Sequence, residues 1–254
     1  GHTHMERREI ALQASTLLEA QAGEVENRIQ SLLANEELVT THPDWLQFPS
    51  SSKAEQSIAK ALKASLKTQS SLPSILIDKA VEWAQAKAGF SFADAQSEGI
   101  RNALSSKVAI LTGGPGTGKT TILRAIVSIL KAKKAKVLLA APTGRAARRM
   151  AESASHMAQT VHRLLKFDPA HGGFTVNERA PLVCDFLIMD ETSMLDIRLA
   201  ALFRSVPAHA HVLLVGDADQ LPSVGSGNVL KDLIEKKPLA RIEKTNFMMN
   251  EIGG

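Results

Sequence analysis

One segment limits the folds open to this chain more than any other. Residues 113–120 read Gly-Gly-Pro-Gly-Thr-Gly-Lys-Thr and fit the pattern G-x-x-x-x-G-K-[ST] of a phosphate-binding loop. An apolar run, Val108–Leu111, precedes the loop, and a helical pattern from Lys119 to Leu130 follows it. Because the motif requires this context, the sequence predicts a strand–loop–helix unit rather than a glycine-rich turn that binds nothing.

The residue types of the loop suit a bound triphosphate. Glycines let successive backbone N–H groups curl around the β-phosphate, and the positive end of the new helix points there. We expect Lys119 to reach the β- and γ-phosphates and Thr120 to ligate Mg²⁺. The predicted nucleotide-binding residues of the loop are Gly113, Gly114, Pro115, Gly116, Thr117, Gly118, Lys119, Thr120 and Thr121.

Charge and cysteine content narrow the class of protein without deciding it. The net charge of +4 over 254 residues is compatible with a nucleic-acid partner but does not require one. Cys184 is the only cysteine, which excludes an intramolecular disulfide or a cysteine zinc site and fits a reducing cytoplasm. It lies in the run Leu182–Met189, which is typical of a strand, so a buried thiol is favoured over a nucleophile. No apolar stretch reaches the roughly 18 residues of a membrane span.

Residues 6–89 predict a mostly helical N-terminal domain. Before them, residues 1–5 are typical of a cleaved-tag remnant, so we expect them to lie outside the fold and to hold no metal. A short strand is expected at Leu38–Val39 and a loop at residues 41–52, while Pro73 suits a helix start and Gly89 a helix end. Apolar side chains recur at helical spacing at Val25, Ile29, Leu32 and Leu33, at Ile58, Leu62 and Leu66, and at Ile77, Val81 and Ala84. Such a region forms either a winged-helix-like DNA-binding unit or a packing unit, and packing is the simpler interpretation.

From residue 90 onward, short apolar runs alternate with helical patterns. This alternation indicates an α/β fold with a parallel sheet covered on both faces. Ser91 is expected to cap a helix over Phe92–Leu104. The other expected helices cover 119–130, begin at Gly144, and lie near 196–203; the expected strands are 108–111, 137–141, 186–189 and 212–215. Residues 166–185 break the alternation and predict an inserted β-hairpin with a glycine turn.

Polar side chains follow three of these strands. Asp190 and Glu191 come directly after strand 186–189, at the sheet edge where ligands of parallel sheets bind. Asp190 suits Mg²⁺ held through water, and Glu191 suits orientation and deprotonation of the attacking water. Gln220 follows strand 212–215 and is our candidate for sensing the γ-phosphate. Thr143, at the start of the helix after strand 137–141, offers donors to a phosphate, although such a residue is more often a plain helix cap.

One further candidate precedes the first strand. The amide of Gln96 can pair with adenine in a bidentate manner, accepting from N6 and donating to N7. Taken alone, Gln96 is more simply a solvent-facing residue of a helix.

Together these segments resemble the RecD-like branch of superfamily 1 DNA helicases, related to the alpha subunit of exodeoxyribonuclease V. The resemblance runs from about residue 24 to about residue 235. Its most characteristic string is Gly-Asp-Ala-Asp-Gln-Leu-Pro-Ser-Val-Gly-Ser-Gly-Asn at 216–228. It implies a RecA-like motor domain at 90–254 in which strand 212–215 lies between strands 108–111 and 186–189.

The resemblance also implies roles for the candidate residues. Gln96 would read adenine, Lys119 and Thr120 would hold the phosphates and Mg²⁺ of ATP, Asp190 and Glu191 would serve Mg²⁺ and the attacking water, and Gln220 would sense the γ-phosphate. The residues implied to contact single-stranded DNA are Pro142, Thr143, Gly144, Arg145, Thr160 and His162. The inserted hairpin would help to split duplex DNA at junctions, translocation would run 5′ to 3′, and nuclease or repair proteins would be partners.

The resemblance ends after Lys236. Members of the family carry an arginine-bearing Phe-Arg-Gln segment where this chain has Thr245–Met249, and their second motor domain, with its arginine fingers, has no counterpart in these residues. An arginine finger is worth about 10³–10⁵ in rate. We therefore expect a fragment that binds nucleotide, hydrolyses it poorly and does not unwind DNA.

Two other functional classes stay open at this point. One is an inert DNA- or partner-binding module that uses ATP as a structural ligand, which predicts nucleotide-dependent stability without turnover. The other is a ring-forming P-loop ATPase, which should carry its own second-region arginine. The motor domain ranks first, the inert module second and the ring-forming ATPase third, since no such arginine signature is seen in this sequence.

Overall fold

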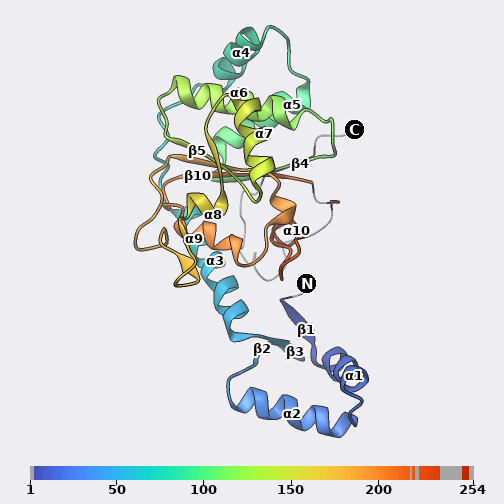
Figure 1. Cartoon of the computed structure of the whole chain (residues 1–254). Helices are drawn as coiled ribbons and strands as arrows, with labels where there is room; N and C mark the ends of the chain where they lie inside the picture. Colours follow the sequence, from blue (N-terminus) through green and yellow to red (C-terminus); the bar gives the residue numbers. More distant parts are fainter. Residues whose placement is uncertain (1–2, 218, 221–222, 235–247, 252–254) are drawn as a thin grey trace.

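A six-stranded parallel sheet forms the centre of the structure (Figure 1). The computed structural model describes residues 3–217, 219–220, 223–234 and 248–251. The strand order is β11–β4–β10–β9–β5–β6, and every neighbouring pair runs parallel. The strands are β4 (Val108–Thr112), β5 (Val137–Ala141), β6 (Ala158–Thr160), β9 (Phe186–Met189), β10 (His211–Gly216) and β11 (Met248–Glu251).

The strand order confirms the topology that the family resemblance implies. Strand β10 pairs with β4 on one side, Val215 opposite Leu111, and with β9 on the other, Leu213 opposite Ile188. The carboxyl ends of β4, β9, β10 and β5 therefore meet at one edge of the sheet, which is where parallel α/β sheets bind their ligands. The α/β fold predicted from the alternating pattern is confirmed.

Side chains alternate along each strand and pack into two cores, one on each face. On one face, Leu111, Ile188 and Leu213 pack against α4 (Ile77–Ala88), α5 (Asp94–Ser105), α6 (Lys119–Ala132) and α7 (Gly144–Ala154). On the other, Ile110, Leu187 and Leu214 pack against α3 (Pro49–Lys67), α8 (Val161–Leu164), α9 (Leu202–Ser205) and α10 (Val229–Ile234). Figure 1 shows these two groups of helices on opposite sides of the strands.

Helix α6 shows how the sequence determines these layers. Ile122 and Ile126 have no exposed surface and lie on the face toward the sheet, as a spacing of four residues requires. Burying each side chain contributes about 1.5–3 kcal/mol. Burial of this face, not helix propensity alone, therefore fixes the helix that follows the phosphate loop.

Three helix boundaries differ from the sequence prediction. Helix α4 begins at Ile77 rather than near Pro73, because Leu72 and Ile75 pack against the core outside the helix. Helix α5 begins at Asp94, so Ser91 is not its cap. The expected helix near 196–203 is a 3₁₀ turn, Leu199–Ala201, followed by the short α9. The end of α4 at Gly89, which has φ +81°, is confirmed.

The first part of the chain forms a small unit of its own at one end of the molecule (Figure 1). Its sheet is antiparallel in the order β1–β3–β2. The elements are β1 (His4–Glu6), α1 (Arg7–Leu18), α2 (Ala22–Ala34), β2 (Val39–His42) and β3 (Trp45–Gln47). A separate core of Val25, Ile29 and Leu46 holds the unit together.

Two expectations for this unit were wrong. His4 and Met5 pair with Gln47 and Leu46, so residues 1–5 do not all lie outside the fold. Residues 41–52 are not a loop, because β2, β3 and the first turn of α3 occupy most of them. Loop-forming residue types are present there, but Leu46 is buried and Pro49 opens a helix, where a missing N–H costs nothing.

Helices α3 and α4 precede residue 90 yet belong to the cores of the parallel sheet. Ile58 and Leu62 of α3 lie in one core, and Val81 and Ala84 of α4 lie in the other. The division of the chain into domains at residue 89 stays a prediction.

The inserted hairpin and the burial of the lone cysteine agree with expectation, but the strand expected over Leu182–Met189 begins only at Phe186, so Cys184 precedes it. Strands β7 (Phe167–Asp168) and β8 (Gly173–Phe174) pair antiparallel within residues 166–185. Cys184 is buried, and burial raises the pKa of its thiol to about 12, so it stays protonated and is a poor nucleophile. None of the helices in the described part of the chain is long and apolar enough to cross a membrane.

Candidate active site at the edge of the parallel sheet

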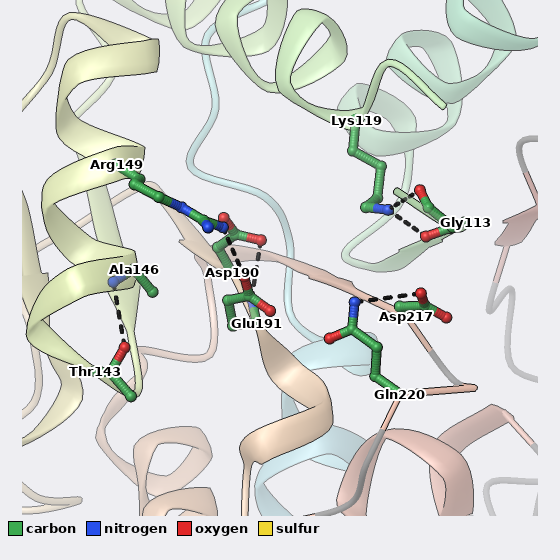
Figure 2. A network of polar contacts seen from close by, with 10 residues as sticks. Gly113, Lys119, Thr143, Ala146, Arg149, Asp190, Glu191, Asp217 and Gln220 are labelled. Carbon is green, nitrogen blue, oxygen red and sulfur yellow. Dashed lines mark hydrogen bonds and ion pairs between the residues drawn. The ribbon is translucent and has the colours of Figure 1, made fainter. Parts of the chain in front are cut away.

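The phosphate loop connects β4 to α6 as predicted. Gly116 and Gly118 have φ of +81° and +87°, conformations that side chains with a Cβ rarely adopt, so glycine is needed at both positions. The Lys119 Nζ donates to the carbonyl oxygens of Gly113 and Gly114, at 2.7 Å for Gly114 (Figure 2). The lysine thus folds over its own loop. An anion bound in the loop would replace these carbonyl oxygens as the hydrogen-bond partner of the ammonium group.

Gln96, from α5, lies directly against the loop. A Cβ added at Gly118 would overlap the Gln96 Nε2. The Gln96 Oε1 accepts a hydrogen bond from the Ala93 N–H at 3.1 Å, which orients the amide at the start of its helix. The side chain predicted to read adenine is therefore beside the phosphate loop, while its contact with a base stays a prediction.

Asp190 and Glu191 lie at the carboxyl end of β9. The Asp190 N–H donates to the Ala140 carbonyl of β5 at 2.9 Å, and the Asp190 Oδ1 accepts from the Glu191 N–H at 2.9 Å. Burial raises the pKa of Asp190, and the positive charges of Arg149 and Lys119 act against that rise. The charge of Lys119 thus acts on Asp190 although the two are distant in sequence; Figure 2 shows both side chains.

Glu191 adopts an unusual backbone conformation and a specific ion pair. Its φ of +53° lies in the left-handed region, which is uncommon for a residue other than glycine. Its Oε1 accepts a hydrogen bond from the Arg149 Nη2 of α7 at 2.9 Å (Figure 2). The side chain of Glu191 is 25% exposed and that of Arg149 is 64% exposed.

The end of β10 contributes Asp217 and Gln220. Gln220 is exposed, and its Nε2 donates to the Asp217 Oδ2 at 3.3 Å (Figure 2). Asp217 is buried and also accepts from the Asp219 N–H. The predicted sensor is thereby tied to a carboxylate that the sequence reasoning gave no role. The signal for Asp217 was the same as for Asp190, an acidic residue directly after a buried strand.

Thr192 fastens β9 to β10 beside the site. Its Oγ1 donates to the Val215 carbonyl at 2.9 Å, and it is fully buried. A Cβ added at Gly216 would come within 2.5 Å of that Oγ1, so the strand end and the turn after Glu191 pack without room for a side chain. The positions of the acidic pair and of Asp217 are therefore fixed relative to one another.

The residues predicted to contact DNA gather at the neighbouring strand ends. Pro142, Thr143, Gly144 and Arg145 follow β5. Thr160 ends β6, where it pairs with Ala141 of β5, and His162 lies two residues further on. Both threonines cap helices, since the Thr143 Oγ1 accepts from the Ala146 N–H and the Thr160 Oγ1 from the Arg163 N–H, each at 3.2 Å. Capping uses the lone pairs of each hydroxyl and leaves its proton free for a phosphate. Their contact with DNA stays a prediction.

An aromatic cluster next to these residues was not foreseen. The His162 ring lies 5.5 Å from Phe167 and 5.8 Å from Phe174, both on the inserted hairpin. The two phenylalanine rings meet edge to face at 5.5 Å. The hairpin is thus anchored to α8 by ring packing, a contact that no local sequence pattern announces.

The oxygen donors of the site fit Mg²⁺ together with a triphosphate. Thr120 offers an exposed hydroxyl at the start of α6, and Asp190 offers a carboxylate near Lys119. Mg²⁺ is commonly held by one or two such protein oxygens, waters and the substrate phosphates. Within the part of the chain that the structure describes, there is no group of three or more His, Cys, Asp or Glu side chains that could hold a metal ion.

Comparison of the sequence with known proteins identifies the family of this chain. The family model described as an AAA domain matches residues 96–226, more than half of the chain. Over 207 residues the chain is 37% identical to the ATP-dependent RecD2 DNA helicase of Deinococcus radiodurans, covering 81% of this chain and 28% of that protein. It is 37% identical over 166 residues to the RecBCD enzyme subunit RecD of Mycobacterium tuberculosis, covering 56% of this chain and 29% of that protein.

Among solved structures, the Pif1 helicase of Candida albicans has a TM-score of 0.42 at 22% identity, covering 63% of this chain and 40% of that one. The chain spans less than a third of the length of the two curated relatives named above. The phosphate loop, the acidic pair and Gln96 all lie inside the matched region. The chain therefore belongs to the AAA domain family, and RecD-type DNA helicases are its homologues over that domain.

Proposed function

We propose that this chain is the first motor domain, with its N-terminal region, of an ATP-dependent helicase or translocase that acts on single-stranded DNA. The observation that carries the proposal is one ion pair. The Arg149 Nη2, on the helix that begins at the predicted DNA residues, donates to the Oε1 of Glu191, the neighbour of Asp190 after β9. The proposed hydrolysis site and the proposed DNA-contacting residues would thus lie next to each other at one edge of the sheet. The names of the RecD and RecD2 relatives support the same activity.

The proposed chemistry assigns each side chain a step. Lys119 and the loop N–H groups would hold the β- and γ-phosphates. Glu191 would accept a proton from the attacking water as the water oxygen bonds to the γ-phosphorus and the bond from that phosphorus to the bridging oxygen breaks, so that ADP and phosphate leave. Mg²⁺, held by Thr120 and by Asp190 through water, would neutralise charge on the β- and γ-oxygens. Gln220 would follow the γ-phosphate, with Asp217 orienting its amide.

We further propose that efficient hydrolysis requires a second motor domain, which in the full-length protein would close over the phosphates and provide an arginine. This would leave the isolated chain able to bind nucleotide but slow to hydrolyse it. Movement from 5′ to 3′ along DNA belongs to the same proposal. Its support is the family resemblance and the fraction of each relative that the chain spans.

The deciding measurement is ATP turnover by the full-length protein with and without single-stranded oligo(dT), with Lys119→Ala as the blank. Stimulation by DNA is expected. An ATP turnover rate that is the same with and without oligo(dT) would contradict the motor proposal. Unwinding of duplexes with either a 5′ or a 3′ single-stranded tail would then test direction.

An inert nucleotide-binding module is the second candidate, because Glu191 is engaged by Arg149 and Lys119 by its own loop. It predicts that Mg²⁺–ATP raises the melting temperature of the full-length protein while no phosphate is released. Phosphate release at any DNA-dependent rate would reject it.

A further inference from the structure

The ion pair between Arg149 and Glu191 joins the two functions proposed above. Glu191 follows β9 in the candidate hydrolysis site, whereas Arg149 belongs to α7, whose first turn carries Thr143 and Arg145. Neither side chain is deeply buried, so breaking the ion pair does not leave an uncompensated charge in the core.

We infer that Arg149 is a positioning residue that senses DNA: it holds Glu191 in the DNA-free protein and exchanges Glu191 for a DNA phosphate when a strand binds along α7. This inference rests on the proposed function and adds the regulation of its catalytic carboxylate. The occupant is a backbone phosphate, so the exchange is independent of base sequence.

The geometry of α7 supports this exchange. Arg145 and Arg149 are four residues apart and therefore neighbours on one helix face, one turn from each other. A strand whose phosphate contacts Arg145 and the helix N-terminus has its next phosphates near Arg149. Because 64% of the Arg149 side chain is exposed, its guanidinium can turn toward that strand.

The ion pair should lower the activity of Glu191 as a base, and a DNA phosphate that replaces Glu191 should restore it. The Glu191 Oε1 that accepts from the guanidinium is a poorer acceptor for the proton of an attacking water. Arginine matches phosphate oxygens as well as it matches a carboxylate, with the same forked geometry. An exposed ion pair is weak, so one phosphate contact is enough to compete with it.

A double-mutant cycle in DNA binding tests the exchange on this chain without any nucleotide. The affinity for fluorescently labelled oligo(dT) is measured by anisotropy at one salt concentration for the wild type, Glu191→Gln, Arg149→Ala and the double variant. Glu191→Gln frees Arg149 and should tighten binding about two- to fivefold, the range that an exposed ion pair is worth. In the Arg149→Ala background the same change should leave the affinity unaltered.

Two variants on the same helix serve as controls. Glu152→Gln removes a negative charge from α7 and should change DNA affinity equally with or without Arg149. Arg148→Ala removes a neighbouring positive charge and should leave the effect of Glu191→Gln intact. An equal gain from Glu191→Gln in both Arg149 backgrounds, or no gain at all, overturns the inference, since the first is a long-range charge effect and the second shows no exchange.

Turnover by the full-length protein gives the second readout. Arg149→Ala should raise the DNA-independent rate severalfold and reduce the stimulation by oligo(dT) toward one, whereas Arg148→Ala should keep the basal rate. Equal losses of basal and stimulated rates in Arg149→Ala would instead mean that Arg149 orients Glu191 for catalysis, which also overturns the exchange.

The two proposals fail in different ways. A protein that binds DNA but shows no DNA-stimulated turnover defeats the proposed function, while the binding cycle still decides the role of Arg149. A protein without measurable DNA affinity defeats both.

Discussion

The Gln96 Nε2 occupies the space that a side chain on Gly118 would need, so α5 and the last glycine of the phosphate loop pack without a gap. This contact places an amide capable of bidentate pairing next to the loop that we propose binds the phosphates. Gln96→Ala should therefore weaken ATP binding by about tenfold, within the 1–3 kcal/mol that a bidentate pair with a base contributes. Competition of ATP and GTP against a fluorescent nucleotide measures the change in both affinities.

The preference for ATP over GTP is the informative quantity in that experiment. Gln96 also accepts from the Ala93 N–H, and losing this cap costs on the order of 1 kcal/mol of stability, which would affect both nucleotides equally. If Gln96→Ala weakens ATP and GTP to the same extent, the amide supports the helix and does not read the base.

Lys119→Ala should abolish nucleotide binding with little loss of fold stability. In the wild type the ammonium group contacts only its own loop among the contacts described, so its removal leaves the cores intact. The readout is the rise in melting temperature on adding Mg²⁺–ATP, which should be present in the wild type and absent in the variant.

Lys131→Ala is the matched control, because Lys131 lies on the same helix and donates to the Ser155 carbonyl away from the loop. It should keep the nucleotide-induced rise. A rise of wild-type size in Lys119→Ala would show that the loop does not bind the phosphates in the way proposed.

Glu191→Gln should retain ATP binding and reduce hydrolysis by about 10²–10⁴, the usual contribution of a general base. The full-length protein is the material for this test, with phosphate release as the rate and the thermal shift as the binding control. An undiminished rate would transfer the role of base to another group, and the candidate would be Asp217, the buried carboxylate that follows the neighbouring strand.

Local patterns were sufficient for the strands and helices that build the sheet. Val108–Leu111, Phe186–Met189 and Val212–Val215 are continuous apolar runs, and both faces of the sheet bury them, so the pattern and the packing agree. Strand β6, Ala158–Thr160, was missed because three partly buried residues carry no periodicity. Its pairing with β5 comes from tertiary contact.

Candidate site residues could be predicted where they belong to the phosphate-loop motif or where a polar residue directly follows an apolar strand. The motif pointed to Lys119 and the strand end to Asp190 and Glu191, but neither gave a reason to connect Arg149 with Glu191, which are 42 residues apart. That pair depends on how α7 packs beside β9 and on the left-handed turn at Glu191. Side-chain pairing across elements is decided by the fold and not by local spacing.

Thr143→Ala should have two separate effects. The Thr143 Oγ1 caps α7, so its loss should lower the free energy of unfolding by about 1 kcal/mol. If its hydroxyl also donates to a DNA phosphate, DNA affinity should fall mildly and uniformly across sequences. Urea unfolding and oligo(dT) binding measure the two effects.

Thr143→Ser keeps both the acceptor and the donor and should behave as the wild type in each assay. A normal DNA affinity in Thr143→Ala, alongside the loss of stability, would leave Thr143 as a helix cap only.

His211 predicts how stability depends on pH. It is 4% exposed, its Nδ1 lies 2.8 Å from the Ser106 carbonyl, and its Nε2 lies 2.7 Å from the Ser70 Oγ. Burial, helped by the positive charge of Lys107, lowers the pKa of His211 from 6.5 to about 4. Between these values the unfolded chain binds a proton that the folded chain does not, so stability falls as pH drops through 6.5 toward 4. From pH 7 to pH 5 the free energy of unfolding should decrease by about 2 kcal/mol through this group.

His211→Gln tests this assignment because glutamine fills similar space and does not titrate. Its free energy of unfolding at pH 7 should be lower than that of the wild type, since a ring stacked on Phe186 is lost, but the decrease between pH 7 and pH 5 should shrink by about 2 kcal/mol. Urea unfolding at the two pH values gives both numbers. A pH dependence identical to that of the wild type would assign the acid sensitivity to other groups and would mean that His211 is protonated in the folded protein at pH 5.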